Sequence, residues 1–199
     1  MSRTSRPQRV AAVPVALVTL LATACSGEGE PSPTSDPSRS LGDPSAAPTL
    51  AVEPVVKPGD VVGRLPRKDR DRVVDAVSGV AVRYLEAAYL AGDYPRSGFG
   101  EAFAGFTRGA AQVARDDRGL LTNQGVGARV EQVTTSSLRV TVDVLAADGG
   151  ARAATAHVNL LFRTEGGYAK RVQVRGRLRM TKQDGRWAVF GYGMSKGAR

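Results

Sequence analysis

The sequence predicts an α+β domain in which two N-terminal helices pack on a strongly curved antiparallel sheet of about five strands. Three observations lead to this fold class. Apolar residues recur with the period of a helix before residue 117, the period changes to two after Gly127, and Gly-rich turn sequences separate the later segments. Helices followed by a run of strands are typical of α+β folds. A chain of 199 residues is long enough for one such domain with a buried core.

The first helix is predicted from Pro66 to Gly92. Proline suits the first turn of a helix, where its missing N–H has no intrahelical acceptor, and glycine suits the end. Its buried face is expected to hold Val73, Val77, Val80, Tyr84 and Ala88. A second helix is predicted over residues 100–116, with Gly105 and Gly109 interrupting it.

Five strands are predicted beyond Gly127, near 128–135, 137–146, 151–164, 168–182 and 186–195. Residues 147–150, 165–167 and 183–186 are the turn sequences that separate the later four. Alternation of apolar and polar residues assigns one side of each strand to the core. Gly176 lies in the middle of its strand, where a bend or bulge is expected.

The N-terminus carries the pattern of an export signal. Arg3, Arg6 and Arg9 precede an apolar run from Val10 to Ala24. Fifteen residues rise only about 22 Å as a helix, which is short of the roughly 30 Å hydrocarbon core of a membrane. A basic start, a short apolar stretch and small residues afterwards indicate a signal peptide over residues 1–24.

The end of this segment, Leu20-Leu21-Ala22-Thr23-Ala24-Cys25-Ser26-Gly27, resembles the lipobox of bacterial lipoproteins. The resemblance implies cleavage between Ala24 and Cys25 and acylation of Cys25, which is the single cysteine of the chain. Ala22 stands where the family prefers leucine. Ala22-Thr23-Ala24 also fits an ordinary signal-peptidase site, so free secretion of a chain that begins at Cys25 is the competing interpretation.

Residues 25–60 are predicted to be a disordered tether. Seven prolines alternate with Ser, Thr, Gly and Asp, and apolar residues are too sparse to offset the entropy of ordering. Val55, Val56, Val61 and Val62 are candidates for a short strand at the edge of the folded domain, which is assigned to residues 61–199.

The last strands resemble those of NTF2-like (SnoaL-like) domains, and more narrowly those of actinobacterial lipoproteins and Mce-associated proteins that share this fold. The resemblance is carried by Arg175-Gly176-Arg177-Leu178-Arg179-Met180 and by the Asp184-Gly185-Arg186-Trp187 turn with the strand to Tyr192. It covers about residues 66–195. It implies a cone-shaped sheet with an interior pocket, but no particular reaction, because the fold hosts isomerases, adaptors and assembly domains.

No catalytic residue, metal or cofactor is predicted. Enzymes of the resembling family use buried acids and a tyrosine, for which Asp143, Tyr84 and Tyr89 are candidates by type only. Asp143 falls on the polar side of its strand, where we expect a solvated carboxylate beside Arg139 or Arg175. The chain has one cysteine and one histidine, His157, which argues against a transition-metal site. No phosphate-binding loop or nucleophile elbow occurs in the sequence.

Aromatic side chains supply the candidate pocket. These residues either line an apolar cavity or fill the core: Tyr84, Phe103, Phe106, Trp187 and Tyr192.

The remaining signal is charge. The chain has a net charge of +9, and residues 51–199 hold 24 basic and 15 acidic side chains. Arg171, Arg175, Arg177 and Arg179 share one side of the fourth strand, opposite its apolar face. This surface is either solvated, covered by a partner such as a second copy in a homodimer, or an anion-binding surface. Outside the cell, anionic headgroups, wall polymers or an acidic envelope protein fit such a surface better than nucleic acid.

The sequence therefore favours a membrane-anchored lipoprotein on the extracytoplasmic side of the cell membrane. Its NTF2-like domain is expected to act as a non-catalytic binding or assembly module of the cell envelope. A small-molecule enzyme or carrier that uses the cone cavity is the alternative.

Overall fold

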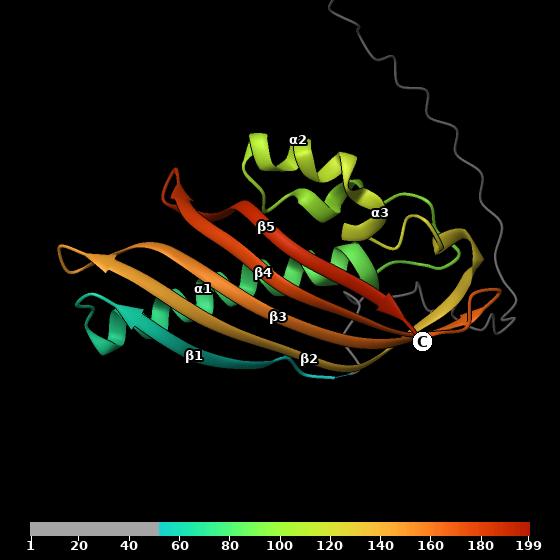
Figure 1. Cartoon of the computed structure of the whole chain (residues 1–199), viewed down its shortest axis with the longest axis horizontal. Helices are drawn as coiled ribbons and strands as arrows, with labels where there is room; N and C mark the ends of the chain where they lie inside the picture. Colours follow the sequence, from blue (N-terminus) through green and yellow to red (C-terminus); the bar gives the residue numbers. More distant parts are fainter. Residues whose placement is uncertain (1–51) are drawn as a thin grey trace, which may run out of the picture. The chain divides into compact units, whose positions relative to one another are not determined.

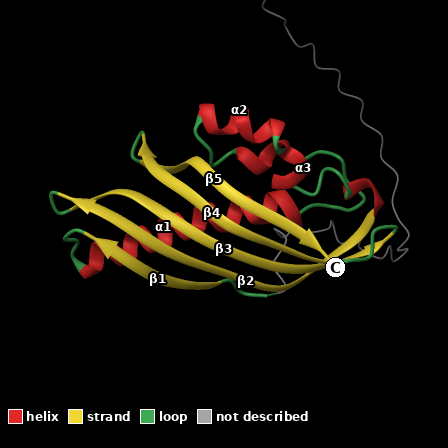
Figure 2. Ribbon diagram, viewed as in Figure 1, coloured by secondary structure: helices red, strands yellow, loops and turns green. Residues whose placement is uncertain are grey.

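The computed structural model describes residues 52–199, which form an α+β arrangement with one five-stranded sheet (Figures 1 and 2). The strands are β1 (Val55–Val62), β2 (Val130–Ala147), β3 (Gly150–Gly166), β4 (Arg171–Gln183) and β5 (Arg186–Ala198). The helices are α1 (Arg67–Leu85), α2 (Arg108–Asp116) and α3 (Arg118–Leu121), with short π- or 3₁₀-helical turns at η1 (Glu86–Leu90), η2 (Gly100–Phe103) and η3 (Gly127–Arg129). The predicted α+β class is confirmed.

The sheet has the order β1-β2-β3-β4-β5, and it is mixed rather than wholly antiparallel. β2 to β5 form the expected antiparallel meander, but β1 pairs in parallel with β2. The expectation that residues up to 60 form a disordered tether is therefore wrong for residues 55–60, and the folded part begins before residue 61. The valines at both ends of this stretch allow the strand, and the backbone N–H of Asp60 donates a hydrogen bond to Asp143 Oδ1 (3.0 Å).

The first two strands predicted after Gly127 are one continuous strand, β2. The register against β3 shifts between Thr135 and Ser137. A bulge inserts an extra residue, and it bends a strand without ending it. It therefore reverses the alternation at this point, which explains why the sequence pattern reads as two strands.

α1 begins at Arg67, directly after Pro66, and its apolar face covers one face of the sheet. In Figure 1 it lies behind the sheet, and the sheet's other face is turned towards the viewer. We call these the inner and the outer face. The helical path continues from α1 through η1 to Leu90, near the predicted end at Gly92.

The single helix expected over residues 100–116 is instead two helices, η2 and α2. Between them, Gly105 and Thr107 exchange backbone hydrogen bonds with Val189 of β5 (2.9 and 2.8 Å). A helix cannot make these bonds, because its backbone groups are already paired within it. The Thr107 side chain then caps α2 by accepting a hydrogen bond from the backbone N–H of Ala110 (3.3 Å).

Gly176 has a different role from the predicted bend. The register shift of β4 against β5 lies between Arg179 and Met180, not at Gly176. Gly176 has a φ of 155°, and a Cβ placed there would lie 2.2 Å from the carbonyl oxygen of Gly193. Glycine is required at this position because β5 approaches the backbone too closely for any side chain.

Candidate anion-binding site

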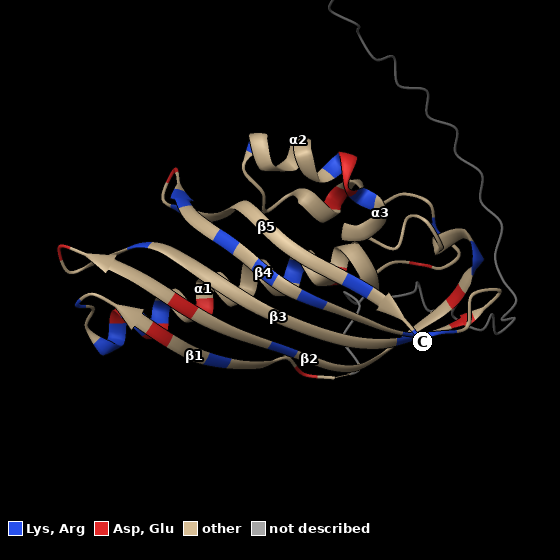
Figure 3. Ribbon diagram, in the orientation of Figure 1, with Lys and Arg blue, Asp and Glu red and all other residues tan. Residues whose placement is uncertain are grey.

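The four arginines singled out in the sequence stand together on the outer face of β4. Inward and outward residues alternate along this strand, so that Val172, Val174, Leu178 and Met180 are buried. The alternate positions place Arg171, Arg175, Arg177 and Arg179 outward, and all four are exposed. We call these four the arginine row; Figure 3 shows the cations along β4 in blue.

No carboxylate neutralises the arginine row within residues 52–199. The ion pairs of this part of the chain lie elsewhere, on α1, at the β2–β3 turn and between Asp143 and His157. The row therefore keeps its positive charge towards solvent.

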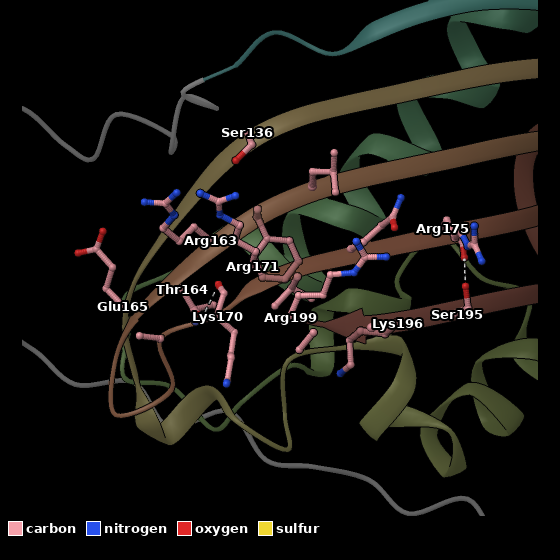
Figure 4. Close-up of a pocket in the computed structure, with 17 residues that line it drawn as sticks. Ser136, Arg163, Thr164, Glu165, Lys170, Arg171, Arg175, Ser195, Lys196 and Arg199 are labelled. Carbon is pink, nitrogen blue, oxygen red and sulfur yellow. Dashed lines mark hydrogen bonds between the residues drawn. The ribbon is translucent and has the colours of Figure 1, made fainter.

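A hollow of about 1180 Å³ opens on the outer face at one end of the arginine row. Figure 4 shows the side chains around it, which come from the bulge of β2, from β3 and β4 with their connecting loop, and from the end of β5. Five of the lining residues are exposed cations: Arg163, Lys170, Arg171, Arg175 and Arg199. Glu165 is the acidic side chain among the lining residues.

Three of these arginines lie side by side across neighbouring strands. Arg163 of β3 is directly opposite Arg171 of β4. Arg171 in turn exchanges backbone hydrogen bonds with Arg199 (3.1 and 2.9 Å). We call Arg163, Arg171 and Arg199 the arginine ladder. Like charges directly opposite each other destabilise a sheet, and an anion bound between them would relieve that repulsion.

Lys196 also lines the hollow, but its ammonium group is hydrogen-bonded inside the domain. Its Nζ donates hydrogen bonds to the carbonyl oxygens of Gly119 (2.5 Å) and Thr122 (2.6 Å). Burial lowers the pKa of this amine. Lys196 therefore holds the end of α3 against β5 and is not part of the exposed basic surface.

Asp143 and His157 form a pair on the outer face. Asp143 Oδ2 lies 2.7 Å from His157 Nε2, and its Oδ1 accepts the Asp60 N–H. The expected neighbours of this carboxylate, Arg139 or Arg175, were therefore wrong. The partner is His157, which is paired with Thr141 and is thus the diagonal neighbour of Asp143 across β2 and β3. The pair fastens β1 to the sheet through Asp60.

The two tyrosines that were candidates for catalysis lie on the inner face. The hydroxyl of Tyr84 donates to the carbonyl of Leu121, and that of Tyr89 to the carbonyl of Leu120, both at 2.9 Å. Burial raises the pKa of both phenols well above 10. Asp143 projects from the opposite face of the sheet, so the acid and the tyrosines do not converge on one site.

The residues expected to line a pocket are not part of the hollow. Tyr84, Phe103 and Phe106 pack against one another, with ring centroids 5.3 to 6.5 Å apart, and Tyr192 contacts Phe106 at 6.3 Å. These four rings fill the interior between the helices and the sheet. Trp187 is separate from them, near the β4–β5 turn, where its ring faces Lys182 Nζ at 5.7 Å.

Tyr192 is held at the edge of this cluster by a carboxylate. Its hydroxyl donates to Asp117 Oδ2 (2.7 Å). Burial, with Asp117 next to it, raises the pKa of Tyr192 to about 12. The phenol is therefore a structural contact between β5 and the start of α3.

Sequence reasoning missed Arg163 and Arg199 as members of the basic surface. Arg163 could have been found from the hairpin register, because the turn at residues 165–167 brings it opposite Arg171. Arg199 could not have been found in this way, because the last strand was expected to end near residue 195. In the structure β5 continues to Ala198.

Other predicted features lie outside residues 52–199, among them Ala24, Cys25 and the signal segment. Within the described residues, no helix is both long and apolar enough to cross a membrane, and no group of three or more potential metal ligands occurs. No known protein family, curated protein or solved structure matches this chain.

Proposed function

We propose that this protein is a lipoprotein of the cell envelope whose domain binds anionic envelope material through the outer face of its sheet. The observation that carries the proposal is the arginine row, which is exposed and lacks carboxylate partners within the described residues, together with the hollow at its end. A surface of this kind attracts anions from a distance and concentrates them.

Binding rather than catalysis is favoured by the interior of the domain. Four of the five aromatic residues that would line a cone cavity pack against one another, and the hydroxyls of Tyr84 and Tyr89 donate to backbone carbonyls. A small-molecule enzyme or carrier would need a cavity there with converging polar groups.

The NTF2-like assignment is part of the proposal. A long helix packed on one face of a meander whose last hairpin contains the Asp184–Tyr192 segment supports it. In this arrangement the outer face stays free for a ligand. Pairing two copies through that face would bring arginine rows together and cost electrostatic energy, which favours a ligand over a homodimer.

Membrane attachment through Cys25 would place this face near its ligand. Two acyl chains on the cysteine give stable anchoring, and the Pro-rich segment that follows would act as a spacer of several tens of ångströms. Blocking lipoprotein processing with globomycin, or the change Cys25→Ala, should alter processing of the chain. Unchanged processing together with free release would contradict the anchor.

The binding proposal is tested by charge reversal. A variant with Arg175→Glu, Arg177→Glu and Arg179→Glu should lose most of its sedimentation with isolated cell walls or anionic liposomes, and wild-type binding should weaken as salt is raised. Arg108→Glu on α2 is a control for charge reversal away from the outer face. Binding that responds to neither the reversal nor the salt would refute the proposal.

A further inference from the structure

The charges that β4 contributes to the outer face are arranged along a line. Arg175, Arg177 and Arg179 occupy alternate positions of β4, so they are about 6.7 Å apart, and the row from Arg171 to Arg179 spans about 27 Å. The arginine ladder broadens the line at the end where the hollow lies. The basic surface is therefore a strip with a wider end, not a closed pocket.

This arrangement determines what kind of anion is held well. Each arginine of the row is exposed, and a solvent-exposed ion pair contributes little free energy. A small anion reaches only one or two of these side chains. Substantial affinity requires a ligand that contacts several arginines at once, so that the small contributions combine.

The neighbouring strand leaves room for such a ligand beside the row. Gly191 is paired with Arg179, Gly193 with Arg177 and Ser195 with Arg175. A Cβ added at either glycine would meet nothing within 4 Å, and neither has a positive φ. Packing and backbone conformation therefore do not require these glycines, and the arginines are not obstructed on that side.

A linear polyanion fits this surface better than a bilayer does. No exposed large apolar side chain belongs to β4 or lines the hollow. On β5 the exposed one is Phe190, at the register shift beside Arg179 and far from the hollow. A single apolar side chain at one end gives this region little that would insert among lipids. The arginine ladder lines a depression, which a flat layer of headgroups cannot enter but the end of a linear polymer can.

We propose that the ligand of the outer face is a linear polyanion with phosphate groups, which lies along β4 and β5 and ends in the hollow between the arginines of the ladder. This inference rests on the proposed function and narrows it to one class of ligand. The guanidinium groups of the row and the ladder would each contact a phosphate group of this polyanion.

Length dependence tests the inference directly. Long-chain polyphosphate, tripolyphosphate and inorganic phosphate are titrated against the full chain in nonionic detergent, at equal total phosphate. Long-chain polyphosphate should bind at least tenfold more tightly than tripolyphosphate, because only the longer chain spans the row. Micelles that contain phosphatidylglycerol, added as competitor at the same concentration of anionic groups, should displace it poorly.

Variants locate the binding. The pair Arg175→Gln and Arg177→Gln should lower the affinity for long-chain polyphosphate about tenfold and reduce its salt dependence, whereas Arg108→Gln should change neither. Gly193→Val would place a branched side chain beside Arg177 in a space that is open in the domain. It should weaken polyphosphate binding without lowering the melting temperature, and Thr141→Val on the outer side of β2 is its control.

The outcomes separate the inference from the proposed function. If anionic micelles bind and long-chain polyphosphate does not, or if tripolyphosphate binds as tightly as the long chain, the linear ligand is refuted while anion binding by the outer face stands. If the micelles, the polyphosphates and inorganic phosphate all fail to bind, both are refuted. Unchanged binding by both the double arginine variant and Gly193→Val would also overturn the inference.

Discussion

Replacement of Gly176 by alanine should destabilise the domain strongly, and the structure gives the size of the effect. The new Cβ would lie 2.2 Å from the carbonyl oxygen of Gly193 and 2.7 Å from the Cα of Met194, which are backbone atoms that cannot rotate away. The φ of 155° adds backbone strain of about 1–3 kcal/mol. Separation of β4 from β5 would weaken the adjacent hydrogen bonds, each of which contributes about 1 kcal/mol. We expect a total loss of about 2–4 kcal/mol.

Urea unfolding of the full chain, followed by circular dichroism, measures this loss, and a fall in melting temperature of roughly 10 °C should accompany it. Gly193→Ala is the matched control, because it adds the same methyl group to the facing strand in open space at an ordinary φ. It should be neutral or stabilising by up to about 1 kcal/mol. Equal stabilities of the two variants would refute the reasoning that close approach of β5 dictates the glycine.

Three further predictions concern the core, a helix end and the arginine ladder. Burial raises the pKa of Tyr84 and Tyr89, so the folded state keeps protons that the unfolded chain releases above about pH 10. The free energy of unfolding should therefore fall above that pH by up to about 1.4 kcal/mol per pH unit for each tyrosine. Urea midpoints measured from about pH 9 to about pH 11 should show less of this fall in a Tyr84→Phe/Tyr89→Phe variant. Thr107→Ala removes the cap of α2 and should cost about 1 kcal/mol of unfolding free energy, whereas Thr107→Ser should cost much less. Arg163→Gln removes the like charge opposite Arg171, so it should raise the melting temperature slightly while lowering polyphosphate affinity. A lower melting temperature would contradict the repulsion within the ladder, and an unchanged affinity would contradict its role in binding.

The elements that could be predicted from the sequence are those with a clear hydrophobic period. The alternation along residues 171–180 assigns the arginine row to one face, and the structure places it there. The path of residues 100–116 could not be predicted in this way. Its helical pattern is genuine, but Gly105 and Thr107 find hydrogen-bond partners in β5, which is remote in sequence.

Pairing between distant segments also limits prediction of the site. The arginine row belongs to one strand and was accessible to a periodicity argument, whereas the arginine ladder depends on the register of three strands. The partner of Asp143 illustrates the same limit. His157 is fourteen residues away along the chain, and only the β2–β3 pairing brings the two side chains within 2.7 Å.

The parallel pairing of β1 has a mechanical consequence for an anchored domain. If the chain is held at the membrane while its ligand is held by β4, tension enters the fold at the start of β1, Val55. That strand lies at the opposite edge of the sheet from β5, so the load must pass across β2 and β3 to reach the arginine row. The edge strand is the first element to carry this load, and the hydrogen bond from Asp60 to Asp143 reinforces it part-way along. The force that such an anchored domain withstands would thus be set at β1, well away from the surface that holds the ligand.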